Sequence, residues 1–172
     1  EDQSARVESG TAAGSDLKTA NAELIEQLDA ARKRAVDAGA ERYLRDELSV
    51  VDIASAEAQT VYTDGGDPAE FNAKASDILY QYKALEQAAL AADARKKINE
   101  LNFADYAASE YNAAEDASRK VAQMFNAGAD GKSLFGQAQK ALAGYNAVLN
   151  AGYKILAEQK RKEILELKQY LV

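Results

Sequence analysis

The sequence contains no cysteine, no histidine and a single proline. Without cysteine, the chain has no disulfide, no thiol nucleophile and no thiolate ligand for a metal ion. Without histidine, it also lacks the commonest general base and the commonest ligand of zinc, iron and copper. These absences exclude most hydrolase triads and transition-metal sites. We therefore expect a protein that is not an enzyme and has no metal and no cofactor; a purely carboxylate-based enzyme is the remaining enzymatic alternative.

Positive charge is also in deficit, because the formal net charge is -7. Binding to nucleic acid normally needs a surplus of clustered Lys and Arg, so we expect no nucleic-acid partner. No apolar run is long enough to span a bilayer. The chain starts at Glu1 and its only methionine is Met124, so we expect that a targeting segment or another part of the protein preceded it. Residues 1–15 are polar and rich in Gly, Ser and Ala, which predicts a flexible tether.

What the sequence does contain is a copy of itself. Residues 31–93 align without a gap on residues 94–156. The identical pairs include Arg32/Arg95, Lys33/Lys96, Tyr43/Tyr106, Glu47/Glu110, Gly65/Gly128, Asp67/Asp130 and Tyr82/Tyr145. Each copy reads as helix, glycine loop and helix. We therefore predict an all-α, elongated up-and-down antiparallel bundle of about five helices, built from a duplicated helical hairpin unit and forming one domain over residues 16–172.

Local signals place the individual helices. Apolar spacing predicts a first helix over about 16–38, a second that starts near Arg45, a third that ends near Leu101, a fourth from about Ala107 and a fifth that continues to the end of the chain. Asp67 is the expected N-cap of the third helix, with Pro68 at its first position and Glu70 placed for a capping box. The expected inward residues are Val51, Ala54, Ala58 and Val61 in the second helix, Phe71, Ala75, Ile78, Tyr82, Leu85, Ala89 and Ala92 in the third, Ala114, Ala117, Val121 and Met124 in the fourth, and Leu134, Ala138, Ala141, Tyr145, Val148, Gly152 and Ile155 in the fifth.

Three basic triads form the first candidate site in this otherwise acidic chain. They are Arg32, Lys33 and Arg34; Arg95, Lys96 and Lys97; and Lys160, Arg161 and Lys162. The helices that carry them are expected to run parallel, so the triads would gather at one level as a belt for an anionic partner. The favoured alternative is that cations near helix C-termini interact with the helix dipole and pair with Asp37, Glu100 and Glu163.

Tyrosines form the second candidate. Tyr82 and Tyr145 fall on the predicted inward seams, whereas Tyr80, Tyr111, Tyr153 and Tyr170 are less constrained. An exposed cluster of these four would be an interaction site, and scattered surface tyrosines are the favoured alternative.

Two further patterns have a functional and a structural interpretation. Tyr43 and Glu47, with their copies Tyr106 and Glu110, could form a repeated groove that reads a peptide, but a structural role in the turn of each copy is favoured. The loop acids Asp64, Asp67 and Glu70 lack the ligand pattern of a calcium-binding EF-hand, so turn and cap chemistry is the preferred explanation.

Residues 38–48 (AGAERYLRDEL) and 103–114 (FADYAASEYNAA) carry a family resemblance. They resemble an alanine-rich helical repeat of bacterial envelope lipoproteins, including spirochaetal ones, in which a turn of the form A-G-A-x-x-Y precedes a helix opening with x-x-E-[LY]. The second copy departs from this pattern, with Leu101-Asn102-Phe103 in place of Ala38-Gly39-Ala40. The resemblance implies a protein of the cell envelope, periplasmic or tethered to a membrane through a lipidated cysteine that preceded Glu1.

From the fold and this resemblance we expect a non-enzymatic scaffold or adaptor whose long helical faces bind a protein partner. A lipid- or small-ligand-binding bundle with a cavity between its helices and a surface adhesin are the two alternatives. The sequence leaves the identity of the partner and the oligomeric state open.

Overall fold

A computed structural model describes the backbone of residues 3–171 and the side chains of residues 13–171. In this range the chain forms six α-helices and one 3-10 helix, and no strand. The helices are α1 (Gln3–Asp37), α2 (Ala40–Tyr43), α3 (Arg45–Thr63), α4 (Pro68–Leu101), the 3-10 helix η1 (Ala104–Ala107), α5 (Ala108–Asn126) and α6 (Gly131–Tyr170). The all-α prediction is confirmed.

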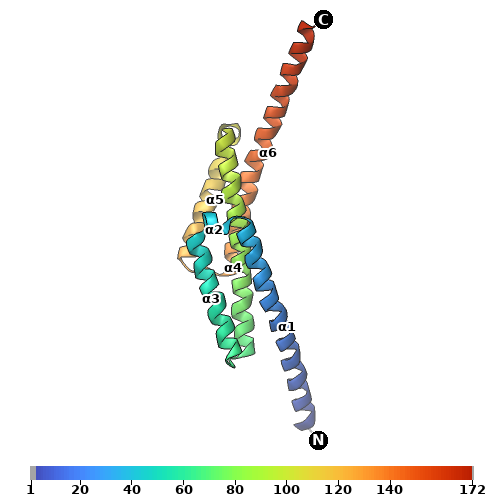
Figure 1. The fold of residues 1–172 in the computed structure, drawn as a ribbon, viewed down its shortest axis with the longest axis vertical. Coiled ribbons are helices and arrows are strands. Elements are labelled where there is room, and N and C mark those ends of the chain that lie inside the picture. Colours follow the sequence, from blue (N-terminus) through green and yellow to red (C-terminus); the bar gives the residue numbers. More distant parts are fainter. Residues whose placement is uncertain (1–2, 172) are drawn as a thin grey trace.

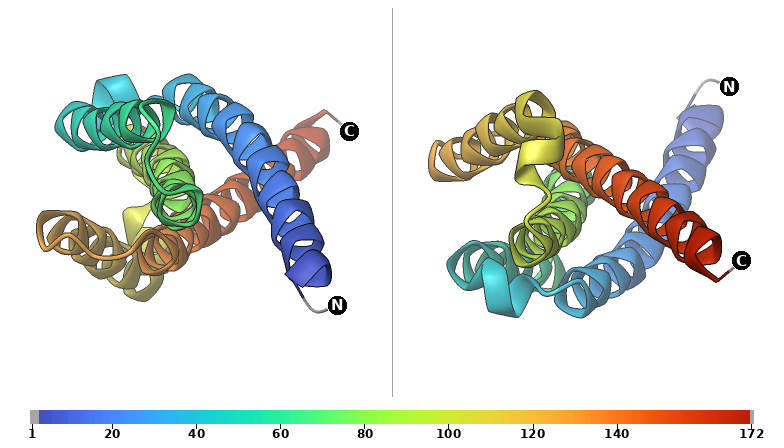
Figure 2. Two further views of the ribbon diagram at one scale, coloured as in Figure 1. Left: turned by 90° about the horizontal axis from the view of Figure 1, so that it is seen from below. Right: turned by 90° about the horizontal axis from the view of Figure 1, so that it is seen from above.

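The long helices run alternately up and down an elongated molecule (Figure 1). Helices α1, α4 and α6 point in the same direction and are stepped along the long axis, while α3 and α5 run back between them. Viewed along that axis, α3 and α5 lie on one side of α4, and α1 and α6 lie on the other (Figure 2). The two ends of the chain are therefore at opposite ends of the molecule.

Two hydrophobic clusters divide the core along α4. The first contains buried side chains of α1, α3 and α4, from Leu24 to Ala89, and the second contains buried side chains of α4, α5 and α6, from Ala91 to Val148. Helix α4 is thus the last helix of a first three-helix unit (α1, α3, α4) and the first helix of a second unit (α4, α5, α6). The sequence repeat produces these two overlapping units because each copy supplies one shorter helix and one long helix.

The predicted inward residues of α4 and α6 are buried except the last of each, Ala92 and Ile155, which are half-buried. Of those predicted in α5, Ala114 and Val121 are buried, and Ala117 and Met124 are half-buried. In α3 the prediction for Val61 is wrong, because its side chain is 57% exposed. The inward face of α3 follows Leu48, Val51, Ser55 and Ala58, spaced by three and four residues, and the next position on that face is Tyr62. Tyr62 stacks on Phe71 with ring centroids 4.3 Å apart.

The predicted N-cap of α4 is also present. Asp67 accepts a hydrogen bond from the amide of Ala69 (3.1 Å), and Pro68 occupies the first turn. The expected capping box is not formed, since the Glu70 carboxylate pairs with Lys74 (2.8 Å). In the second unit Asp130 caps α6 by accepting from the amide of Ser133 (2.9 Å).

The structure differs from the sequence prediction at two further places. Residues 3–15, predicted as a tether, form the first turns of α1, because a proline-free and alanine-rich segment has high helix propensity; residues 1 and 2 lie outside the described range. The short helices α2 and η1 were not predicted. Helix α2 starts directly after Gly39 (φ 107°), and η1 starts two residues after its copy Asn102 (φ 57°). Glycine and asparagine are the residue types that tolerate this left-handed backbone at a helix end.

Candidate partner-binding surface

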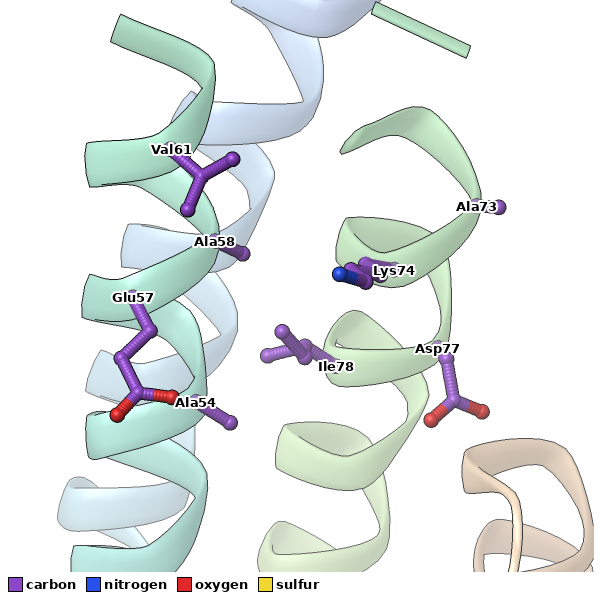
Figure 3. A pocket seen from close by; sticks show the side chains of 8 residues that line it. All are labelled: Ala54, Glu57, Ala58, Val61, Ala73, Lys74, Asp77 and Ile78. Carbon is purple, nitrogen blue, oxygen red and sulfur yellow. The ribbon is translucent and has the colours of Figure 1, made fainter. Parts of the chain in front are cut away.

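An open groove separates α3 from α4 on one side of the first unit (Figure 3). It has a volume of about 580 Å³ and is lined by Ala54, Glu57, Ala58, Val61, Ala73, Lys74, Asp77 and Ile78. Val61 and Ile78 make the apolar part of the groove, and Glu57, Lys74 and Asp77 supply charge. We call it the α3–α4 groove.

The outer surface of α3 beside this groove is unusually apolar for an exposed helix face. Val50, Ile53 and Val61 are 66%, 57% and 57% exposed. At about 100° per residue these three side chains lie on the same stripe as Ala54 and Glu57. We call these five residues the α3 face. Ala54 and Ala58 connect it to the buried side of the helix, so the apolar surface runs from the core out to solvent.

The second unit has no equivalent apolar surface. The positions of Val50 and Ile53 are taken there by Ala113 and Asp116, and the position of Glu57 is taken by Lys120. Val61 alone has a large apolar counterpart, Met124, which is half-buried. Asp116 is exposed and pairs with Arg119 (2.7 Å). A protein fold that needed an apolar stripe at this place would need it in both copies. The apolar side chains at positions 50 and 53 are therefore not a feature that both copies of the unit share.

A hydrogen bond that joins the two helices of the second unit has no counterpart across the α3–α4 groove. In the second unit the amide nitrogen of Gln137 on α6 donates to the carbonyl of Ala117 on α5 (3.3 Å) and bridges the two helices. The equivalent of Gln137 is Lys74, which pairs with Glu70 on its own helix and leaves α3 and α4 unbridged at this point. An apolar helix face could therefore approach the first unit more closely than the second.

The Asp77 carboxylate, at the edge of the groove, already accepts two hydrogen bonds within the fold. One comes from the amide of Gly131 (2.7 Å), the first residue of α6, and the other from the side chain of Gln81 (2.7 Å). A Cβ at position 131 would lie 2.2 Å from the carbonyl oxygen of Asp77, so only glycine allows this contact. Asp77 thus fixes the start of the second unit against the first, at the edge of the groove.

A polar cluster at the centre of each unit joins its three helices. In the first unit the Arg32 guanidinium of α1 binds the Asp52 carboxylate of α3 (2.8 and 2.9 Å), which also accepts from the Tyr82 hydroxyl of α4 (2.6 Å). In the second unit Arg95, Glu115 and Tyr145 repeat this arrangement on α4, α5 and α6, and the Tyr145 hydroxyl lies 2.7 Å from the carboxylate of Glu115.

The electrostatics of the two clusters are alike. Partial burial alone would raise the pKa of Asp52, but hydrogen bonds from Arg32 and Tyr82 lower that pKa below its ordinary value. The pKa of Glu115 is lowered by the same balance, with Arg95 and Tyr145 as the donors. Burial raises the pKa of both tyrosines, and the adjacent carboxylates raise it further. Each cluster is therefore a stable ion pair with a neutral phenol, which fits a structural connection rather than proton transfer.

These clusters are not evident from the identical pairs of the repeat, because Asp52 and Glu115 are similar rather than identical. The signal that could have found them is the spacing, since the acid follows the arginine by 20 residues and precedes the tyrosine by 30 in both copies.

The three basic triads lie at stepped heights rather than at one level, because α1, α4 and α6 are displaced along the long axis (Figure 1). Seven of their nine cations pair with carboxylates. The pairs are Arg32–Asp52, Lys33–Asp37, Arg34–Glu86, Arg95–Glu115, Lys96–Glu100, Lys97–Asp93 and Lys160–Glu163. Most of the positive charge is thus balanced locally, as in the favoured alternative.

The four candidate tyrosines do not form one cluster. Tyr80 packs edge-on against Phe135 beneath Lys83, and the Tyr111 hydroxyl donates to Asn99 (3.1 Å). Tyr153 is half exposed and packs edge-on against Phe103, while Tyr170 is 90% exposed at the end of α6. The scattered arrangement is the one observed.

Tyr43 and Tyr106 also occupy different surroundings. The Tyr43 hydroxyl donates to Asp93 (3.3 Å), whereas Tyr106 is 42% exposed beside Phe103. They do not form a repeated groove.

Over the described part of the chain, no group of three or more His, Cys, Asp or Glu side chains is arranged to hold a metal ion. None of the helices described is both long and apolar enough to cross a membrane. No family model, curated protein or solved structure matches this chain.

Proposed function

We propose that the protein is a non-enzymatic scaffold or adaptor of the bacterial cell envelope, and that it binds an amphipathic helix of a partner protein against the α3 face and the α3–α4 groove. The observation that carries the proposal is the exposed apolar stripe of Val50, Ile53 and Val61, in which the second unit has Ala113 and Asp116 at the first two positions and a half-buried Met124 at the third. Contiguous exposed apolar surface with charged residues at its edge is typical of protein-binding sites.

The dimensions of the stripe suit a helical partner. From Val50 to Val61 it covers three turns of α3, roughly 16 Å. A partner helix with apolar residues at positions i, i+4, i+7 and i+11 presents a stripe of similar length. Glu57 and Lys74 flank the groove with opposite charges, so the partner should carry at least one charged residue of each sign beside its apolar stripe.

The open shape of the hollows supports this proposal over the ligand-binding alternative. The α3–α4 groove and a second hollow of about 380 Å³ between the two units both open to solvent. A lipid or apolar small molecule binds best where most of its surface is enclosed. The proposed envelope location depends on the sequence resemblance. Its test is the amino-terminal sequence of the precursor, where we expect a signal peptide followed by a cysteine that becomes lipidated.

A pair of equivalent positions provides the test of partner binding. A photo-crosslinking amino acid placed at Ile53 of the full chain should give a discrete crosslinked product in cells, because this side chain lies on the α3 face. The same amino acid at Asp116, the equivalent position of the second unit, is the matched control and should give little or none. Equal products from the two positions would contradict the proposal, as would an undiminished product at 53 when Val61→Lys is added.

A further inference from the structure

The end of α6 carries an apolar stripe that no other part of the described structure covers. Every residue from 156 to 171 is exposed, including Ile164 (54%), Leu167 (62%) and Leu171 (86%). A single helix of this length is marginally stable in water without a packing partner. This last part of α6, residues 153–171, is called the α6 tail below.

The stripe is not a continuation of the buried seam of α6. That seam follows Leu134, Ala138, Ala141, Tyr145, Val148 and Gly152. At about 100° per residue, the stripe of Ile164, Leu167 and Leu171 lies roughly 100° around the helix from the seam. In the register of the repeat, the buried Ala91 and Ile98 of α4 correspond to Lys154 and Arg161 of the tail. The tail is therefore not the first helix of a third unit and needs a different kind of partner.

The stripe has the spacing of a short coiled coil. Ala157, Ile164 and Leu171 are seven residues apart, and Lys160 and Leu167 form the alternate row. These are the two rows that form the core between paired helices. The single charged core residue, Lys160, lowers the stability of such a pair and helps to fix its register.

The charges beside the stripe select both the occupant and its direction. Lys154, Arg161 and Lys168 flank one side, and Glu163 lies on the other. In a parallel pair of tails, Glu163 of each copy faces Lys168 of the other, because flanking residues five positions apart meet across a parallel coiled coil. In an antiparallel pair, the three cations of one copy would face the three cations of the other copy, and this like-charge contact is unfavourable. We propose that the α6 tail is a self-association site, in which two copies of this chain pair in parallel through the stripe.

The absence of native cysteine makes a direct test straightforward. In a parallel pair each core residue faces the same residue of the second copy, so Ala157→Cys and Ile164→Cys should each give a disulfide-linked dimer on mild oxidation. Lys162→Cys, on the opposite side of the helix, is the matched control and should give much less. An antiparallel pair can link at one of the two core positions but not at both. Linkage at only one, or at neither above the control, would overturn the proposal.

Charge exchange then tests the specific contact. In the Ile164→Cys background, Glu163→Lys or Lys168→Glu alone should lower the linked fraction, because each places like charges opposite one another. The double exchange should restore it. Failure of the exchange to restore linkage, with helicity unchanged by circular dichroism, would contradict the parallel pairing. Binding of the tail to anionic phospholipid vesicles, with the protein monomeric throughout, would assign the stripe to a membrane surface and overturn self-association.

Discussion

The two units share one sequence pattern and one polar cluster, yet they fill the same space with different side chains. In the first unit the buried residues at two equivalent positions are Ala40 and Ala89; in the second they are Phe103 and Gly152. The gain of a large side chain at Phe103 is matched by the loss of a methyl group at Gly152. The comparison shows that both units keep a filled core and a polar cluster that joins three helices. It also shows that the exposed face of the shorter helix differs between the two copies.

The largest expected effect on stability comes from substitutions at the contact between Phe103 and Gly152. A Cβ at position 152 would lie 2.2 Å from the ring of Phe103, so Gly152→Ala should destabilise the protein by about 1–3 kcal/mol. Phe103→Ala should cost about 3–5 kcal/mol, because it leaves a cavity in the second core. In the Phe103→Ala background the sign of Gly152→Ala should reverse, since the methyl group then fills space and alanine favours the helix. Urea unfolding of the four proteins checks this double-mutant cycle, and additive effects would contradict it.

The helices were predictable from the sequence because their signals are local. The cap at Asp67, the glycine loops and the three-and-four spacing of apolar residues act within a few positions of one another. The buried faces of α4 and α6 follow from the same spacing. What could not be predicted is how the helices are stepped, since this depends on contacts between distant residues such as Asp77 and Gly131.

The candidate site shows the same limit. Val61 fits the apolar period of α3 as well as Tyr62 does, and only the stacking of Tyr62 on Phe71 decides which of them is buried. The α3 face was consequently assigned in part to the core. The comparison of the copies at Ile53 and Asp116 was available in the sequence, but it has meaning only once these positions are known to be exposed.

The polar clusters should contribute equally to the two units. Tyr145→Phe and Tyr82→Phe each remove a hydroxyl that donates to a carboxylate, and a hydrogen bond to a charged group contributes about 1.5–3 kcal/mol. We expect similar losses of free energy of unfolding from both variants in chemical denaturation. A loss confined to one variant would show that only one of the two clusters supports the fold.

The same variants should alter the dependence of stability on pH. The pKa of Asp52 and of Glu115 is lower in the folded protein than in the unfolded chain. The stability that these two carboxylates contribute is therefore complete at a pH above their ordinary pKa values of 3.8 and 4.5, and it is lost as the pH falls through their pKa values in the folded protein. Each Tyr→Phe variant should therefore lose less stability than the unchanged protein over this acidic range. Unfolding curves at a series of pH values check this, and parallel acid limbs would contradict it.

A smaller and symmetric effect is expected at the glycine loops. Gly65 and Gly128 occupy equivalent positions and both have left-handed backbone, with φ of 96° and 68°. A Cβ at either position would meet no atom within 4 Å. The cost of Gly65→Ala or Gly128→Ala is therefore only conformational, about 1–2 kcal/mol in each case. Thermal unfolding should give nearly equal shifts, and Gly14→Ala in α1 is a control in which alanine should not destabilise.

The smallest expected effect is at the place where the two units differ most. Ile53→Asp gives the α3 face the residue that the second unit has at Asp116, and because Ile53 is 57% exposed, the free energy of unfolding should change by less than about 0.5 kcal/mol. The reverse variant, Asp116→Ile, should be equally neutral for stability. If Ile53→Asp instead destabilises the chain as strongly as a core substitution, the apolar stripe belongs to the fold and not to a partner. A neutral effect on stability, together with loss of the crosslinked product from a photo-crosslinker at Val61, would separate folding from binding on a single helix face.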